Sequence, residues 1–331
     1  MPKSTTAATT TVTSATVTAA TTTVTSATVT AATTTVTSAT VTAATATVTS
    51  ATVTAATATV TSATVTAATT TVISATGTAS TTQCSTIFTA QTTYSTGSKP
   101  SSLNVVDVNG DGTPDIIVTN YDSNNVGVLL NIGNGTFSAQ TIYSTGILPA
   151  SVAAADVNGD GKPDIIVANS NSNNVSVLLN TGNGTFAVQT TYSTSNWPVY
   201  VVAADVNGDG TPDIIVTNYD SNNVGVLLNI GNGTFSAQTT YSTDSSPGSV
   251  AAADVNGDGK PDIIVANYGS NNVGVLLNTG SGTFAVQTTC STGAGSNPYY
   301  VAVGDVNGDS KPDIIVANYG SNNISVLLNY C

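Results

Sequence analysis

The chain has 331 residues and a formal net charge of −13, with 18 acidic residues that are all Asp, five Lys, and neither Arg nor His. So little positive charge excludes a nucleic-acid-binding surface, which needs a basic footprint to neutralise phosphates. No run of 18 apolar residues indicates a membrane span, and no group that titrates near neutrality is evident for acid–base catalysis, so we expect a protein without enzymatic activity.

Residues 1–83 form a low-complexity tail. From Thr9 onward the unit TTTVTSATVTAA recurs with a period of 12, and seven of its positions carry a hydroxyl. Thr and Val favour extended backbone. However, Val12 and Val17 fall on opposite faces of a strand, so the tail lacks the apolar face of a half-buried sheet. The composition is typical of a glycosylated stalk, and it predicts an extended, O-glycosylated tail.

Two other structures fit the tail. An uncharged, β-prone segment without Pro is suited to strand pairing between chains, which predicts self-association through the tail. The other is a β-solenoid with 12-residue turns, although the repeats before Gly77 lack the Gly, Asn and Asp expected at solenoid corners. Glycosylation and assembly between chains are compatible with each other.

A longer repeat begins at about residue 84. Its acidic loop occurs five times, starting at Asp107, Asp156, Asp205, Asp254 and Asp305, with three spacings of 49 residues and a last one of 51. Repeats of this length are typical of propellers and solenoids. The second repeat shows apolar runs at 151–156, 164–169, 174–180 and 186–192, bounded by Gly and Asn clusters. Four short strands per repeat predict an all-β, five-bladed β-propeller over 84–331.

The two ends of the propeller region complement each other. The fifth repeat stops after its third predicted strand, whereas 85–97 reads as a fourth strand without a blade before it. Joined, they would complete one blade and close the ring. Alignment of the repeats places Cys84 and Cys331 at the same hairpin position, which predicts a disulfide and an oxidising, extracellular compartment. Cys290 replaces a Tyr and is expected to be an unpaired thiol.

An extracellular location implies export, yet the first residues, MPKSTTAATT, lack the apolar segment of a secretory signal. We therefore expect either a signal that this sequence does not contain or a mature N-terminus.

Each acidic loop has oxygen-bearing side chains at positions 1, 3, 5 and 9, as in DVNGDGTPD at Asp107–Asp115. Gly at position 6 permits a sharp turn, and the carbonyl at position 7 can point inward. Oxygen ligands without His or Cys favour Ca²⁺ over zinc or copper. The loops hold 15 of the 18 carboxylates, and five divalent ions would change the charge from −13 to −3. The alternative is an Asx-rich turn whose side chains cap their own backbone.

The loops therefore predict up to five Ca²⁺ sites, one per blade. The predicted ligands are Asp107, Asn109, Asp111, Thr113 and Asp115; Asp156, Asn158, Asp160, Lys162 and Asp164; Asp205, Asn207, Asp209, Thr211 and Asp213; Asp254, Asn256, Asp258, Lys260 and Asp262; and Asp305, Asn307, Asp309, Lys311 and Asp313. In the fifth loop Ser310 replaces Gly at position 6, which predicts a strained turn and a weaker site.

The runs DVNGDGKPDIIVAN and VSVLLNTGNGTF resemble the FG-GAP/VCBS repeats of integrin-type propellers and of many secreted proteins. The resemblance covers 84–331 and recurs in every repeat, but it does not extend to the tail. It implies an extracellular propeller that holds calcium in the loop between the first and second strands of each blade.

The connections between repeats vary most in sequence and are expected on the face opposite the acidic loops. They carry the only Trp, Trp197, together with Tyr299 and Tyr300. These rings would either stack on a sugar or an aromatic anchor, or pack between blades. Sequons for N-glycosylation occur at Asn134, Asn174, Asn183, Asn232 and Asn323.

Together these features predict an extracellular structural glycoprotein, in which a calcium-stabilised propeller carries a tail that mediates filament or coat assembly. The alternative is a stalk-mounted adhesin or lectin that binds carbohydrate or a surface protein through the propeller loops. Neither function involves nucleic acid or a membrane span.

Overall fold

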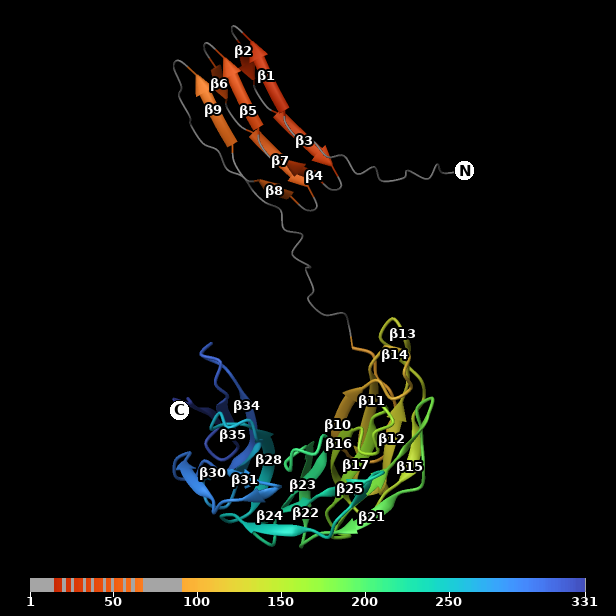
Figure 1. Ribbon diagram of the computed structural model, residues 1–331. Helices are drawn as coiled ribbons and strands as arrows, with labels where there is room; N and C mark the ends of the chain where they lie inside the picture. The colour runs from red at the N-terminus through yellow and green to blue at the C-terminus, as the bar shows by residue number, and fades with distance from the viewer. Residues whose placement is uncertain are drawn as a thin grey trace, which may run out of the picture. The chain divides into compact units, whose positions relative to one another are not determined.

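The computed structural model describes residues 91–330 and, within the tail, the backbone of nine short strands (Figure 1). The chain divides into two compact units, Met1–Thr92 and Thr93–Cys331. Within the described residues, no helix has the length and apolar character that a membrane span requires.

The described tail strands pair in parallel with one another. They are β1 (Ala15–Ala19), β2 (Thr22–Val24), β3 (Ala27–Ala31), β4 (Thr34–Val36), β5 (Ala39–Ala43), β6 (Ala46–Val48), β7 (Ala51–Ala55), β8 (Ala58–Val60) and β9 (Ala63–Ala67). The sheets are β1-β5-β9, β2-β6, β3-β7 and β4-β8. Paired residues are 24 positions apart, so that Val17 lies beside Val41 and Val41 beside Val65.

Parallel, in-register strands satisfy backbone N–H and C=O groups without a separate apolar face. The extended stalk and the solenoid both stay predictions. Glycosylation of the tail concerns side chains outside the described part of the chain, and assembly between chains concerns a second copy. Both remain predictions.

Five similar sheets make up the second unit, and each contains the strands of one repeat. The first strands are β10 (Pro100–Val106), β16 (Pro149–Ala155), β22 (Pro198–Ala204), β28 (Pro247–Ala253) and β34 (Pro298–Gly304). The second strands are β11 (Asp115–Asn120), β17 (Asp164–Asn169), β23 (Asp213–Asn218), β29 (Asp262–Asn267) and β35 (Asp313–Asn318). The third strands are β12 (Asn125–Leu129), β18 (Asn174–Leu178), β24 (Asn223–Leu227), β30 (Asn272–Leu276) and β36 (Asn323–Leu327).

Four of the sheets have an outer fourth strand: β15 (Thr141–Ser144), β21 (Thr190–Ser193), β27 (Thr239–Ser242) and β33 (Thr288–Ser291). All strands within these sheets pair antiparallel in the order β10-β11-β12-β15 and its equivalents. The first repeat also has a short 3₁₀ helix, η1 (Tyr121–Ser123). The predicted all-β repeat of four-stranded units is therefore confirmed for the first four repeats.

A small hairpin separates the third strand from the fourth. The hairpins are β13 (Asn131–Gly133) with β14 (Thr136–Phe137), β19 (Asn180–Gly182) with β20 (Thr185–Phe186), β25 (Asn229–Gly231) with β26 (Thr234–Phe235), and β31 (Asn278–Gly280) with β32 (Thr283–Phe284). The prediction of one continuous strand over 186–192 was therefore wrong. Phe186 closes the hairpin, and Val188, which is 91% exposed, lies in the connection before β21.

The hydrophobic core lies between neighbouring sheets. Because successive residues of a strand face opposite sides of the sheet, each inner sheet contributes to two clusters. Ile165 of β17 packs with the first sheet, against residues such as Ile117, whereas the next residue, Ile166, packs with the third sheet, against residues such as Ile214. Equivalent clusters join the third sheet to the fourth and the fourth to the fifth.

The same hydrogen bond crosses each of these four junctions. The side-chain amide of the Asn that follows each third strand donates to the carbonyl of the second residue in the preceding acidic loop. The four bonds are Asn180 to Val108, Asn229 to Val157, Asn278 to Val206 and Asn329 to Val255, each 2.8 Å long. Because the packing and the hydrogen bond are the same at each junction, each sheet has the same position relative to the sheet before it.

The first and last sheets expose the faces that are buried at the junctions. Leu103 on β10 is 64% exposed, whereas the equivalent Val152 is 6% exposed. Ile324 on β36 is 68% exposed, whereas the equivalent Val175 is fully buried. The five sheets follow an open arc (Figure 1), and within the described residues no fourth strand lies beside β36.

Ring closure is thus not observed in the described residues. Most of the predicted fourth strand, together with Cys84 and Cys331, lies outside them, so closure and the disulfide remain predictions. Cys290 is an exposed, free thiol, as expected.

Candidate calcium loops and tyrosine basin

The last Asp of each acidic loop begins the second strand and is fully buried. In the second loop, Asp164 Oδ2 accepts the backbone N–H of Val157 at 3.0 Å, and its Oδ1 accepts that of Asn180 at 2.7 Å. The same two bonds recur at Asp115, Asp213, Asp262 and Asp313. This carboxylate therefore connects the start of the loop to the end of the third strand.

The other oxygen-bearing side chains hold the loop in its turn. Asp156 accepts the N–H groups of Gly159 at 2.8 Å and Gly161 at 2.7 Å. Asp160 accepts the N–H of Lys162 at 3.0 Å, and the Lys162 ammonium lies 3.2 Å from the same carboxylate. In the first and third loops a Thr hydroxyl takes the place of this ammonium, because Thr113 and Thr211 donate to their loop's central Asp.

Environment moves the pKa values of these carboxyls in opposite directions. Burial raises the pKa of Asp164, Asp213 and Asp262, and the neighbouring carboxylates of each loop raise it further. The Thr113 and Thr211 hydroxyls lower the pKa of Asp111 and Asp209. A divalent cation within the loop would favour the ionised form of all three acidic positions.

The chemistry of the loop fits calcium, because all of its candidate ligands are hard oxygens. Within residues 91–330, however, no three acidic side chains are gathered closely enough to form a metal-binding group as they stand. A carboxylate has about four lone-pair positions, so the backbone hydrogen bonds do not use all of them. The observed geometry is also that of a self-capped Asx turn, and the predicted ligand sets remain a prediction.

Ser310 adopts the left-handed conformation that Gly occupies in the other four loops. Its φ is 67°, compared with 82° for Gly161. Its N–H donates to Asp305 at 2.8 Å, as the N–H of Gly161 does to Asp156. The strained backbone expected in the fifth loop is therefore present, although the loop keeps its hydrogen bond.

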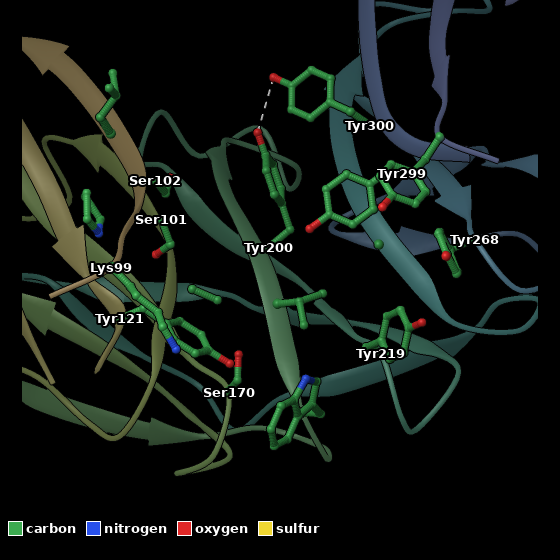
Figure 2. A pocket seen from close by; sticks show the side chains of 17 residues that line it. Lys99, Ser101, Ser102, Tyr121, Ser170, Tyr200, Tyr219, Tyr268, Tyr299 and Tyr300 are labelled. Atoms are coloured by element: carbon green, nitrogen blue, oxygen red, sulfur yellow. Dashed lines mark hydrogen bonds between the residues drawn. The ribbon is translucent and has the colours of Figure 1, made fainter. Parts of the chain in front are cut away.

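A cavity of about 930 Å³ lies where the first strands begin and the second strands end, opposite the acidic loops (Figure 2). We call it the tyrosine basin. The three aromatic residues that the sequence singled out, Trp197, Tyr299 and Tyr300, all line it. Five further tyrosines that sequence reasoning missed line it as well: Tyr121, Tyr200, Tyr219, Tyr268 and Tyr319. Four of them could have been found by aligning the repeats, because the residue after the second strand is Tyr in every repeat except the second, which has Ser170.

Comparison with known proteins identifies the repeat. The FG-GAP-like repeat matches four overlapping segments, residues 107–167, 156–216, 205–265 and 254–316, which together cover more than half of the chain. The chain belongs to the FG-GAP-like repeat family. A search of curated proteins gave no match.

Three solved structures illustrate what this FG-GAP-like repeat protein is similar to. A virginiamycin B lyase from Staphylococcus aureus is 16% identical, with 71% of this chain and 69% of that chain covered and a TM-score of 0.51. The V. cholerae biofilm matrix protein Bap1 is 23% identical, with 71% and 40% covered and a TM-score of 0.42. The Photorhabdus luminescens Tc holotoxin pore is 23% identical, with 67% and 11% covered and a TM-score of 0.40. The likeness to the lyase supports a propeller-like fold and carries no information on activity.

The sequons of this FG-GAP-like protein occupy two kinds of position. Asn134, Asn183 and Asn232 are exposed at the tips of the hairpins. Asn174 and Asn323 begin third strands, where the side-chain carbonyl of each accepts a hydrogen bond from an Asn at the end of the second strand. Asn323 is exposed as well, whereas Asn174 is half-buried, and the occupancy of all five sequons remains a prediction.

Proposed function

We propose that this FG-GAP-like protein is a non-enzymatic, extracellular structural glycoprotein, in which a calcium-stabilised propeller carries a tail that joins copies into a filament or coat. The observation that carries the proposal is the equivalence of the five acidic loops. Each has the same buried Asp bonded to the same two backbone amides. A catalytic centre requires one site to differ from its neighbours, whereas five equal sites suit a structural ion.

The concentration of charge supports bound calcium. Three carboxylates share each short loop, and the chain has only five Lys to offset 18 acidic residues. Without a cation the carboxylates of one loop repel each other: burial raises the pKa of Asp164, and the neighbouring carboxylates of Asp160 and Asp156 raise it further. Calorimetric titration of the full-length protein should find up to five Ca²⁺ ions, and Asp160→Ala should remove one of them. Absence of calcium binding would leave the self-capped turn as the explanation of the loop.

The proposal includes a closed ring of five blades. Tyr94 packs edge to face on Phe137 with ring centroids 5.5 Å apart, as Tyr143 packs on Phe186 at 5.4 Å. Because Tyr143 belongs to the outer strand of the first sheet, Tyr94 takes the place of an outer strand in a blade that precedes it. The fifth sheet is the one that lacks this strand, so closure would complete it and cover the exposed faces of Leu103 and Ile324.

Mass spectrometry of non-reduced peptides tests the closure. A Cys84–Cys331 link within one chain is expected, because closure brings the two ends of the split hairpin together. A Cys84–Cys290 link would contradict the alignment of the blades. A Cys84–Cys331 link found only in covalent dimers would show that the strand is exchanged between copies.

The composition of the tail supports assembly. Among the described tail strands, β1 and β9 each pair with β5. We expect the tail strands to pair with those of another copy, and an uncharged edge offers no electrostatic barrier to such pairing. Electron microscopy should show filaments of the full chain and single particles of a chain that lacks residues 1–83. Filaments of the shortened chain would exclude assembly through the tail.

One observation favours the adhesive alternative. The tyrosine basin is a large aromatic cavity that neither the acidic loops nor the junctions between sheets require. In this alternative the tail presents the propeller, and the basin holds the ligand.

A further inference from the structure

The tyrosine basin is where the repeats diverge. At the third position of the first strand, Ser102, Ser151 and Ser249 occupy three repeats, whereas Tyr200 and Tyr300 occupy the other two. At the second position only the fifth repeat has an aromatic residue, Tyr299, where the others have Ser, Ala, Val and Gly. Because the strand pairs in the same register in every repeat, these substitutions change the basin without changing the sheet.

The aromatic residues gather on one side of the basin. Ring centroids are 6.4 Å apart for Tyr219 and Tyr268, 6.2 Å for Tyr268 and Tyr299, and 6.0 Å for Tyr299 and Tyr319. We call these four rings the tyrosine wall. Tyr319 is 71% exposed and Tyr299 is 61% exposed. Tyr219 and Tyr268 are half-buried. The rings thus support each other, and the two exposed rings offer a preorganised apolar platform.

A tyrosine pair stands beside the wall. The Tyr200 hydroxyl donates to the Tyr300 hydroxyl at 3.3 Å, with ring centroids 5.8 Å apart. Figure 2 shows this pair next to Tyr299, while Lys99, Tyr121 and Ser170 lie together on the other side of the cavity. The basin therefore has one side rich in tyrosines and another side where Lys99 and Ser170 lie beside Tyr121.

Only one charged side chain, Lys99, lines the basin, and its charge is paired. The Lys99 ammonium lies 2.8 Å from the Asp122 carboxylate. No carboxylate lines the cavity. Within residues 91–330 the hydroxyls of the four wall tyrosines have no hydrogen-bond partner, so they can donate to and accept from a ligand. A neutral, hydroxyl-rich ligand is therefore favoured over an ion.

We propose that the tyrosine basin binds a neutral oligosaccharide, whose sugar rings stack on the tyrosine wall while the tyrosine hydroxyls bond to its hydroxyl groups. A sugar ring has an apolar C–H face and a polar rim, which matches exposed tyrosines with unpaired hydroxyls. A lipid would bury those hydroxyls without partners. A proline-rich peptide needs an extended aromatic groove, whereas this cavity is a basin with aromatic residues mainly on one side. The proposal rests on the adhesive alternative and is independent of calcium and of the tail.

The chain carries its own reporter for the test. Trp197 is the only Trp, it is half-buried, and it lines the basin. Titration of the full-length protein with maltohexaose, cellohexaose, mannohexaose and xylohexaose should give a saturable change in Trp emission with at least one of them. Polygalacturonate serves as the anionic control and decaproline as the peptide control. If none of the neutral sugars binds, or only decaproline does, the proposal is wrong.

Variants then locate the site. Tyr299→Ala and Tyr319→Ala should each weaken binding of the sugar by about tenfold, because each removes one stacking face. Tyr330→Ala is the matched control, since Tyr330 is 80% exposed but lies outside the basin, and it should leave the affinity unchanged. Affinity that survives both basin substitutions would overturn the proposal.

A thermal melt of each variant, measured in the presence of calcium, distinguishes a role of the tyrosine in ligand binding from a role in stability. An unchanged melting temperature with lost sugar binding assigns the tyrosines to the ligand. Failure of sugar binding in the unaltered protein would leave calcium stabilisation and assembly through the tail unaffected, because neither measurement involves the basin.

Discussion

The two faces of the propeller are built from opposite ends of the same strands, and they differ in how far their repeats have diverged. On the loop face the same carboxylates bond to the same backbone amides in every repeat. On the basin face, equivalent positions hold Ser, Ala, Gly, Val or Tyr. A side chain that satisfies buried backbone groups cannot be exchanged without loss of stability, whereas a side chain lining an open basin can. The loop face therefore stabilises the fold, and the basin face is free to acquire specificity.

The largest expected effect comes from removing the proposed calcium ions, which would act on the loop face alone. A site saturated at 1,000 times its dissociation constant contributes about 4 kcal/mol to the free energy of unfolding. Loss of several ions should therefore lower the melting temperature by more than about 10 °C. Scanning calorimetry in excess EGTA checks this, and Tyr299→Ala should show the same decrease. An unchanged melting temperature would remove calcium from the explanation of the loop face.

The next effect concerns the buried carboxylate. Asp213→Ala leaves the N–H groups of Val206 and Asn229 without their acceptor, and each unsatisfied buried group costs about 1–3 kcal/mol. Denaturant titration of the metal-free protein should show a loss of about 2–6 kcal/mol in the free energy of unfolding. Asp220→Ala, at an exposed Asp outside the loops, is the control. Equal stability of the two variants would contradict the anchoring role.

A smaller effect is expected from pH in the metal-free protein. The pKa of Asp164, Asp213 and Asp262 is raised from 3.8 by burial, so the folded state binds these protons more tightly and their contribution to stability falls as pH rises above 3.8. The pKa of Asp111 and Asp209 is lowered from 3.8 by Thr hydroxyls, so their contribution is lost as pH falls below that value.

The three buried carboxyls titrate above pH 3.8, and the carboxyls of Asp111 and Asp209 titrate below it. The melting temperature of the metal-free protein should therefore be highest near pH ~4. Melts between pH 3 and pH 7 measure this. Asp213→Asn should weaken the decrease above the maximum, because it removes one of the three raised carboxyls. Calcium should reverse that decrease by favouring the ionised loops. A steady rise in stability up to neutral pH without metal would contradict the assignment.

The smallest effect tests the one irregular loop. Ser310 is held at a φ of 67°, where a residue with a Cβ is less stable than Gly by about 1 kcal/mol. Ser310→Gly should raise the free energy of unfolding by about that amount. Gly210→Ser should lower it by a similar amount, because Gly210 has a φ of 88° and space for a Cβ. Denaturant titration of both variants checks the pair, and effects of the same sign would refute the interpretation.

Much of the propeller unit follows from local sequence. The spacing of the Asp loops, the alternating strands and the Gly and Asn turns predicted the repeat and its four strands, since each depends on residues close in the chain. A hairpin between the third and fourth strands was predicted, but the break between Phe186 and the fourth strand was not, because the sequence 186–192 is β-prone throughout. Before this break the Ala187 N–H donates to the Leu179 carbonyl at 2.8 Å, a pairing that a strand pattern does not specify.

The candidate ligand site was only partly predictable, for a different reason. Trp197, Tyr299 and Tyr300 stand out in variable connections, whereas Tyr219 and Tyr268 belong to a turn that looks the same in most repeats. Their role depends on the arrangement of five sheets, which brings residues about 50 and 100 positions apart into one wall. The tail strands pair 24 residues apart, which is two repeat units. A 12-residue repeat fits pairing at 12 or at 24 residues equally well, so its sequence does not predict which occurs.

The four identical junctions also determine where the molecule can begin to open. In a linear row of blades each inner blade is held by two interfaces and each end blade by one, so opening starts at the ends and moves inward. The last sheet, which has three strands in the described part of the chain and an exposed Ile324, is then the weakest unit and should exchange its amide hydrogens first. A fifth junction between the ends would give every blade two neighbours, so that no blade could separate without breaking two interfaces at once.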